Sequence, residues 1–192
     1  MTVPLRCVVL ISGTGTLLNA LLEAIDAGKV DAQVVAVGAD RAAPGLQFAT
    51  DRGIDTFIVK LDRGGDRAEW DRALTEATAS FHPDLVISAG FMKLVGRWFL
   101  ERFGGRFINT HPALLPSFPG AHAVRDALAA SVEVTGCTIF AVDEGVDTGP
   151  IIAQTAVAVL PGDDEASLHE RIKVEERRLL IKVVKEWRRN HE

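Results

Sequence analysis

Asn109 and His111 are the side chains whose types and spacing point most directly to catalysis. They stand two residues apart where a predicted short strand at 106–109 leads into a proline-rich loop at 111–120. Alternation along an extended strand places both side chains on one side of the chain. An amide donor beside a protonated imidazole suits the oxyanion that forms when a carbonyl group is attacked. The alternative is that His111 is a structural or surface histidine of a stiff loop.

Three carboxylates lie in a second candidate segment, Asp143-Glu-Gly-Val-Asp-Thr-Gly-Pro150. Its two glycines and its proline predict a loop. A carboxylate of this loop beside His111 would favour the protonated imidazole and could accept a proton through a water molecule. Taken by itself, the segment is also typical of a solvated acidic hairpin. Its spacing does not fit an EF-hand, so calcium binding is not supported.

The segment Ser12-Gly-Thr-Gly-Thr16 lies between a predicted buried strand and a predicted helix. Two glycines let backbone N–H groups approach an anion closely, and a helix N-terminus favours negative charge, so phosphate is the natural ligand. Leu18 stands where a dinucleotide fingerprint has its third glycine, and the Gly-Lys-Ser/Thr of a Walker A loop is absent. The alternative is a tight turn that requires glycine for its backbone alone.

The elements that must position these groups alternate between strand and helix in the first half of the chain. Such alternation is typical of βαβ units and a parallel sheet. Right-handed crossovers place the loops after the first and fourth strands at the same carboxyl edge, where ligands of open α/β sheets bind. We therefore expect an α/β, doubly wound fold with a mostly parallel sheet and a Rossmann-like N-terminal half. The expected order is strand 5–11, helix 17–28, strand 33–38, a short helix within 44–53, strand 56–59, helix 66–81 and strand 85–88.

The second half has a different pattern. A helix is expected over 122–130, and strands over 132–142 and 151–160, which could pair antiparallel. A long amphipathic helix closes the chain, with Asp163 or Asp164 as its N-cap. Its expected apolar face consists of Leu168, Ile172, Leu179, Val183 and Trp187. His169 lies on this charged helix without a partner at metal-ligand spacing, and no functional role is expected for it.

Composition excludes several classes of protein. The chain has 192 residues, of which 47% are apolar and 24% charged, as expected for one globular domain. A net charge of −5 argues against a general nucleic-acid or anionic-membrane binder. No apolar stretch approaches the ~20 residues of a membrane span, and the first apolar run is too short for a signal peptide, so we expect a cytoplasmic protein. Cys7 and Cys137 lie in apolar runs and are expected to be buried thiols.

Four segments, in this order, resemble those of the folate-dependent formyltransferases, and within them the phosphoribosylglycinamide formyltransferases (glycinamide ribonucleotide transformylases). The resemblance covers nearly the whole chain. The third segment followed by the fourth is specific for folate formyltransferases, whereas the first segment and the tail at 170–176 narrow the resemblance to the glycinamide ribonucleotide branch. The segments are Ile11-Ser-Gly-Thr-Gly-Thr16, Ser88-Ala-Gly-Phe-Met-Lys93, Asn109-Thr-His-Pro-Ala-Leu-Leu-Pro116 and Asp147-Thr-Gly-Pro150.

The resemblance implies an enzyme of de novo purine (IMP) biosynthesis. It would transfer the formyl group of 10-formyltetrahydrofolate, its co-substrate, to the amine of N1-(5-phospho-D-ribosyl)glycinamide, without a metal. The implied catalytic residues are Asn109, His111 and Asp147. The implied nucleotide-binding residues are Gly13, Thr14, Gly15, Thr16, Leu17, Lys173, Val174, Glu175 and Glu176. The implied folate-binding residues are Arg67, Met92, Lys93, Leu94, Val95, Asn109, Asp143, Glu144, Gly145, Val146 and Asp147.

The resemblance also implies one catalytic domain over residues 1–192. We expect a nucleotide- and phosphate-binding half at 1–105 and a folate-binding and catalytic half at 106–192. A homodimer is compatible with the sequence, whereas nucleic-acid and membrane partners are not expected. The chain ends soon after its last helix, whereas many relatives continue further.

Two residues depart from the family pattern. Leu17 stands where the family usually has asparagine, so a side-chain contact to the nucleotide is lost. Phe140 stands where most members have histidine, so a polar neighbour for proton movement is missing. The nearest alternative function is 10-formyltetrahydrofolate hydrolase, which uses water as acceptor but typically has a preceding regulatory domain and a second histidine in place of Pro112. Methionyl-tRNA formyltransferase typically adds an RNA-binding domain. A non-catalytic folate- or nucleotide-binding relative and a Rossmann dehydrogenase complete the alternatives.

Overall fold

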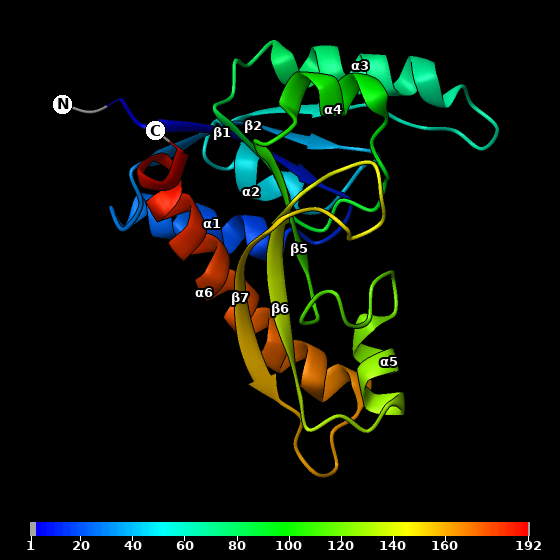
Figure 1. Ribbon diagram of the computed structural model, residues 1–192. Coiled ribbons are helices and arrows are strands. Elements are labelled where there is room, and N and C mark those ends of the chain that lie inside the picture. Colours follow the sequence, from blue (N-terminus) through cyan, green and yellow to red (C-terminus); the bar gives the residue numbers. More distant parts are fainter. Residues whose placement is uncertain (1–2, 192) are drawn as a thin grey trace.

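A seven-stranded sheet forms the centre of the protein in the computed structural model, which describes residues 3–191 and the side chains as far as Arg188 (Figure 1). The strand order is β3-β2-β1-β4-β5-β6-β7. The first five strands in this order run parallel, whereas β6 pairs antiparallel with β5 and with β7. This confirms the predicted α/β fold with a mostly parallel sheet. The strands are β1 Leu5–Ile11, β2 Ala32–Ala39, β3 Asp55–Ile58, β4 Leu85–Ser88, β5 Phe107–His111, β6 Val134–Ala141 and β7 Ile151–Ala158.

Helices cover both faces of this sheet (Figure 1). On one face, α3 and α4 pack together, and on the other face α6 packs against α1, α5, β6 and β7. The short helix α2 lies on the same face as α1. The helices are α1 Thr16–Asp26, α2 Leu46–Thr50, α3 Arg67–Ala79, α4 Arg97–Phe103, α5 Ala123–Ala129 and α6 Glu165–His191.

The central strand β1 shows why the strands read as continuous apolar runs. Val8 and Leu10 belong to the apolar core beneath α3 and α4, whereas Val9 and Ile11 belong to the core beneath α1 and α6. All four side chains are fully buried. A parallel strand covered on both faces has no solvent side, so it needs no polar alternation.

The long helix α6 closes the second face as its periodicity predicts. The five side chains of its expected apolar stripe are all buried. Its N-cap is Asp164, whose carboxylate accepts a hydrogen bond of 2.8 Å from the backbone N–H of Ser167. Asp163 instead forms an ion pair with Arg171, with 2.7 Å between Oδ2 and Nη1. Asp164 is therefore confirmed as the N-cap, whereas Asp163 holds the first turns of α6 through its ion pair with Arg171.

Helix α4 has no counterpart among the sequence predictions. Its seven residues are too few for a clear period, and its N-terminal backbone groups are capped by a side chain from another helix. Asp71 of α3, which is 2% exposed, accepts hydrogen bonds from the backbone N–H groups of Gly96, Trp98 and Phe99. A cap that lies about 25 residues away along the chain leaves no local signal.

Cys7 and Cys137 are buried free thiols, as expected from the sequence. Burial is the main cause that raises the pKa of each thiol to about 12. Over residues 3–191, no helix combines the length and the apolar character needed to cross a membrane.

Candidate functional site

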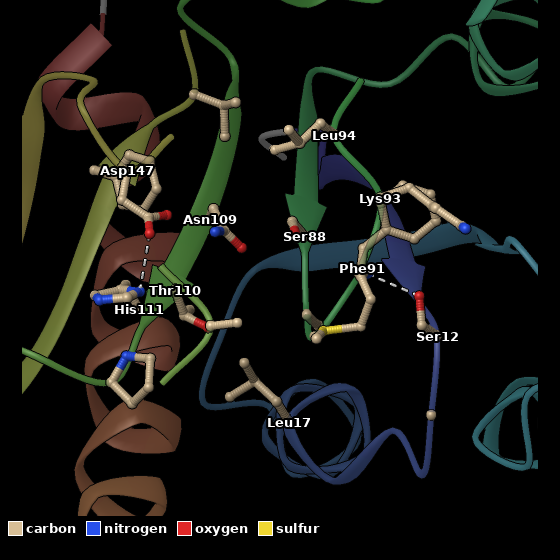
Figure 2. Close-up of a pocket in the computed structure, with 18 of the residues that line it drawn as sticks. Ser12, Leu17, Ser88, Phe91, Lys93, Leu94, Asn109, Thr110, His111 and Asp147 are labelled. Atoms are coloured by element: carbon tan, nitrogen blue, oxygen red, sulfur yellow. Dashed lines mark hydrogen bonds and ion pairs between the residues drawn. The ribbon is translucent and has the colours of Figure 1, made fainter. Parts of the chain in front are cut away.

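A cavity of about 630 Å³ opens at the carboxyl edge of the sheet, where β1, β4 and β5 end. Its walls come from the loops that follow these strands, the loop at 142–147 and one face of α6. Figure 2 shows Asn109 and His111 on one side of this cavity and Ser12 on the other. The topology therefore brings together the three segments that the sequence singled out.

His111 lies at the end of β5 and is 4% exposed. Its Nδ1 atom is 3.4 Å from Oδ2 of Asp147, and its Nε2 atom is 2.7 Å from the carbonyl oxygen of Phe118 (Figure 2 shows the contact with Asp147). Both ring nitrogens therefore face oxygen atoms that can only accept. An imidazolium donates to both of them, whereas a neutral imidazole donates to one.

Asp147 is the carboxylate of the acidic loop that approaches His111. Its backbone has a φ of 56°, in the left-handed region, and its Oδ2 atom accepts a 2.8 Å hydrogen bond from the backbone N–H of Gly120. This bond joins the acidic loop to the proline-rich loop. Asp143 acts within its own loop, where Oδ1 accepts from the Thr148 hydroxyl at 2.7 Å. The expectation that one carboxylate of this loop lies beside His111 is thus met by Asp147.

A buried polar cluster holds the proline-rich loop against β6. The hydroxyl of Thr138, which is fully buried, donates to the carbonyl of Ala113 at 2.6 Å. The same oxygen accepts from the backbone N–H of Leu115 at 3.1 Å and from Nε2 of Gln154 at 3.0 Å. These bonds fix the backbone at residues 113–115, which follows His111, while His111 itself is paired with β6 in the sheet.

Asn109 lines the cavity and lies two residues before His111 on β5. In the antiparallel ladder its partner on β6 is Phe140, which is 2% exposed. Among the described residues, no group forms a hydrogen bond with the Asn109 side-chain amide. The amide is therefore available to a ligand, and Phe140 gives this part of the cavity an apolar wall where a histidine would provide a polar one.

The glycine-rich loop forms one end of the cavity, with residues 12–17 in its lining. Gly15 has a φ of 70°, and a Cβ atom on it would lie 2.8 Å from the Cα atom of Gly45. The backbone of this turn therefore requires glycine at position 15, whether or not the loop binds a phosphate. The same turn begins α1 without a side-chain cap, so its first backbone N–H groups are available to an anion.

One face of α6 supplies three side chains to this end of the cavity: His169, Lys173 and Glu176. Their spacing of four and three residues places them on one side of a helix. His169, for which no functional role was expected, therefore lines the cavity. Burial lowers its pKa, as does the nearby charge of Lys173. The spacing from Lys173 and Glu176 was the signal that could have identified it.

Glu176 has an unusual environment for a carboxyl group. Burial raises its pKa from 4.5 to about 7, although the charges of Lys173 and Arg177 act in the opposite direction. Its neighbours in sequence lie elsewhere: Val174 is 40% exposed, and Glu175 pairs with Arg178 at 2.6 Å. Neither Val174 nor Glu175 lines the cavity.

Apolar side chains surround the other end of the cavity. Met92, Leu94 and Val146 line it and are 69%, 60% and 50% exposed. Exposed apolar groups gathered around a cavity mark a binding surface for an apolar ligand. Arg67 does not line the cavity, but its Nη2 atom donates to the carbonyl of Leu94 at 2.7 Å and so supports this wall.

The cavity also contains Arg41, which the sequence predictions did not include. It lies two residues after the end of β2, so its place at the carboxyl edge was the available signal. Lys93, Val95 and residues 143–145 line the cavity as expected. Within the described residues, no group of three or more His, Cys, Asp or Glu side chains is placed to hold a metal ion.

Comparison with known proteins agrees with this arrangement. The family described as formyl transferase matches residues 5–184. Phosphoribosylglycinamide formyltransferase of Mycobacterium tuberculosis (strain CDC 1551 / Oshkosh) is 57% identical over 181 residues, which cover 94% of this chain and 84% of that protein. The Escherichia coli (strain K12) protein of the same name is 36% identical over 90% of this chain and 82% of its own length.

Solved structures give the same result at the level of the fold. The crystal structure of glycinamide ribonucleotide transformylase 1 from Symbiobacterium toebii superimposes with a TM-score of 0.91 and 42% identity, over 97% of this chain and 89% of that one. With a family match over most of its length and close relatives in sequence and in structure, this chain belongs to the formyl transferase family.

Proposed function

We propose that this enzyme transfers the formyl group of 10-formyltetrahydrofolate to the amine of N1-(5-phospho-D-ribosyl)glycinamide, a step of purine biosynthesis. The observation that carries the proposal is the pair of His111 and Asp147, with the unpartnered amide of Asn109, inside a cavity that has one phosphate-compatible end and one apolar end. The names of the relatives support the same reaction.

The catalytic step follows from the positions of these groups. The amine nitrogen attacks the formyl carbon, and the carbonyl oxygen becomes an oxyanion that accepts hydrogen bonds from the Asn109 amide and from protonated His111. Collapse of this intermediate breaks the bond between the formyl carbon and the folate nitrogen. Overall, the amine loses one proton and the folate nitrogen gains one. The Asp147 carboxylate stabilises the imidazolium form of His111 and assists the proton transfer, either directly or through water.

The two ends of the cavity suggest how the substrates are oriented. The nucleotide phosphate would bind at the backbone N–H groups of residues 13–17, and Glu176 would accept hydrogen bonds from the ribose hydroxyls. The folate would lie against residues 92–95 and 143–147, with its glutamate carboxylates towards Arg67. Residues 92–95 precede the proposed boundary at 105 and residues 173–176 follow it, so each half of the chain contributes to both ends. The division into two halves, the homodimer and the cytoplasmic location remain predictions.

The test is turnover that depends on the acceptor. The protein is mixed with a 10-formylfolate donor, and the deformylated folate is followed by absorbance with and without the nucleotide. Turnover that requires the nucleotide and is lost in His111→Ala supports the transferase. His82→Ala is the matched control, because His82 precedes β4 at the opposite edge of the sheet. Turnover without the nucleotide would instead support the hydrolase, and binding without turnover, unchanged by His111→Ala, would support a non-catalytic relative.

A further inference from the structure

Arg41 lines the cavity at the end formed by the glycine-rich loop and α6, yet no motif of the sequence singled it out. We propose that Arg41 contacts the 5′-phosphate of the nucleotide substrate and that the buried carboxylate of Asp40 holds its guanidinium in position. This inference rests on the proposed function and adds to it a side chain that selects for the phosphate.

The pair formed by Asp40 and Arg41 leaves one edge of the guanidinium available. The Asp40 carboxylate accepts from Nε of Arg41 at 3.1 Å and from its Nη2 at 2.6 Å. Both bonds use the same side of the planar group, so the Nη1 donors remain unused, and no other acceptor among the described residues bonds to them. The Asp40 side chain is 1% exposed, whereas that of Arg41 is 54% exposed. A guanidinium that is fixed along one edge and open along another suits bidentate binding of a phosphate.

Asp40 also lies beside the proposed phosphate loop. The side chain of Ser12, the first residue of that loop, lies near the Asp40 carboxylate and contributes to lowering its pKa. The Ser12 hydroxyl accepts from the backbone N–H of Met92 at 2.8 Å, which Figure 2 shows as a dashed line at Ser12. Burial alone would raise the pKa of Asp40, but the interactions with Arg41 and Ser12 outweigh it and lower that pKa. The carboxylate therefore stays ionised and keeps its hold on Arg41.

The backbone also places the two loops in contact. The N–H of Gly45 donates to the carbonyl of Gly13 at 3.0 Å. A Cβ atom on Gly45 would lie 2.7 Å from the Cα atom of Gly15, so the segment after Arg41 packs directly on the glycine-rich turn. β1 and β2 are neighbours in the sheet, and both loops leave it at the same edge. The segment that follows Arg41 thus packs on the turn that begins α1.

The charge of the substrate requires such a group. A phosphate monoester carries close to two negative charges at neutral pH, and the backbone N–H groups of a helix N-terminus provide only partial positive charge. Leu17 lines the cavity here and has no side-chain hydrogen-bond donor. Lys173 is partly engaged, because its ammonium group pairs with Glu170 at 2.7 Å. Arg41 therefore supplies a full charge that the loop itself lacks.

The experiment compares the nucleotide with the same glycinamide riboside without its 5′-phosphate. In Arg41→Ala we expect the KM for the nucleotide to rise about 10- to 100-fold, as for loss of a charge-assisted bidentate contact, with kcat changed little. The kcat/KM for the riboside should stay unchanged, and Arg41→Lys should recover part of the loss. Arg52→Ala is the control, because Arg52 pairs with Asp26 at 2.8 Å and does not line the cavity.

Binding measured by calorimetry without the formyl donor tests the same preference independently of turnover. The proposal is overturned if Arg41→Ala weakens the nucleotide and the riboside equally, if it weakens neither, or if Arg52→Ala has the same effect. A wild-type protein that binds the nucleotide but does not formylate it would count against the proposed function. The phosphate contact would then still be decided by the affinities of the two ligands for the wild type and for Arg41→Ala.

Discussion

Replacing Glu176 with glutamine should stabilise the protein at high pH and have little effect at low pH. Glu176 lines the cavity, and none of the described residues donates a hydrogen bond to its carboxyl group. Burial raises its pKa from 4.5 to about 7. Between these two pH values the folded protein holds a proton that the unfolded chain has lost.

The sign and size of the effect follow from this difference in proton binding. Because the unfolded chain binds fewer protons, the free energy of unfolding falls as pH rises. The loss begins near pH 4.5 and is complete just above pH 7, where the folded carboxyl group has ionised as well. One pH unit corresponds to about 1.4 kcal/mol, so the full penalty is roughly 3 kcal/mol. Glutamine has nearly the same shape and no charge, so E176Q avoids this penalty.

The assay is urea denaturation of wild type and E176Q at pH 5 and pH 8. The variant should be more stable by up to roughly 3 kcal/mol at pH 8 and by much less at pH 5. Glu175→Gln is the control, since Glu175 lies on the same helix but pairs with Arg178 at 2.6 Å. An advantage of E176Q that is equal at both pH values, or one that Glu175→Gln shares, would refute the reasoning.

Three further substitutions test the supports of the site. Asp71→Ala leaves three backbone N–H groups of α4 without their acceptor and should lower the free energy of unfolding by roughly 3 kcal/mol in urea denaturation. Thr138→Val removes the hydroxyl that binds the proline-rich loop and should cost about 2 kcal/mol by the same measurement, with a lower kcat in the formyl-transfer assay. Asp147→Asn removes the charge beside His111 and should lower kcat on the order of 10²-fold with little change in either KM, as measured by steady-state kinetics. Unchanged values would contradict each expectation.

The parallel half of the fold was predictable because its signals are local. Strand β4 matches its predicted bounds of 85–88, and β1 matches 5–11, since strands covered on both faces are apolar along their whole length. Glycines marked the turns between strand and helix, and one of them, Gly15, does adopt a positive φ. The carboxyl edge could then be inferred from the handedness of the crossovers, which places the loops after β1 and β4 together.

The details of the site depend on contacts between distant segments, which no local pattern records. Arg41 lines the cavity because β2 ends beside it, and His169 lines it because α6 passes beside it. In the sequence alone, each of these residues resembles an ordinary surface side chain. The three carboxylates of the acidic loop could not be ranked by composition. Asp147 is the one that faces His111 because its left-handed backbone and its bond with Gly120 turn it inwards. The family resemblance, and not the spacing, singled it out.

The contacts of the His111 ring decide which of its nitrogen atoms can act in the proposed mechanism. The Nε2 edge is occupied by the Phe118 carbonyl at 2.7 Å, so in the proposed mechanism only the Nδ1–H can serve the substrate. That atom is 3.4 Å from Asp147, longer than an ordinary N–H···O hydrogen bond, while Asp147 itself is held at 2.8 Å by Gly120. In the proposed mechanism, a carboxylate at this distance stabilises the imidazolium without a short hydrogen bond to it. The Nδ1–H is then shared between Asp147 and the oxyanion, and the Asn109 amide on the same strand supplies the second donor.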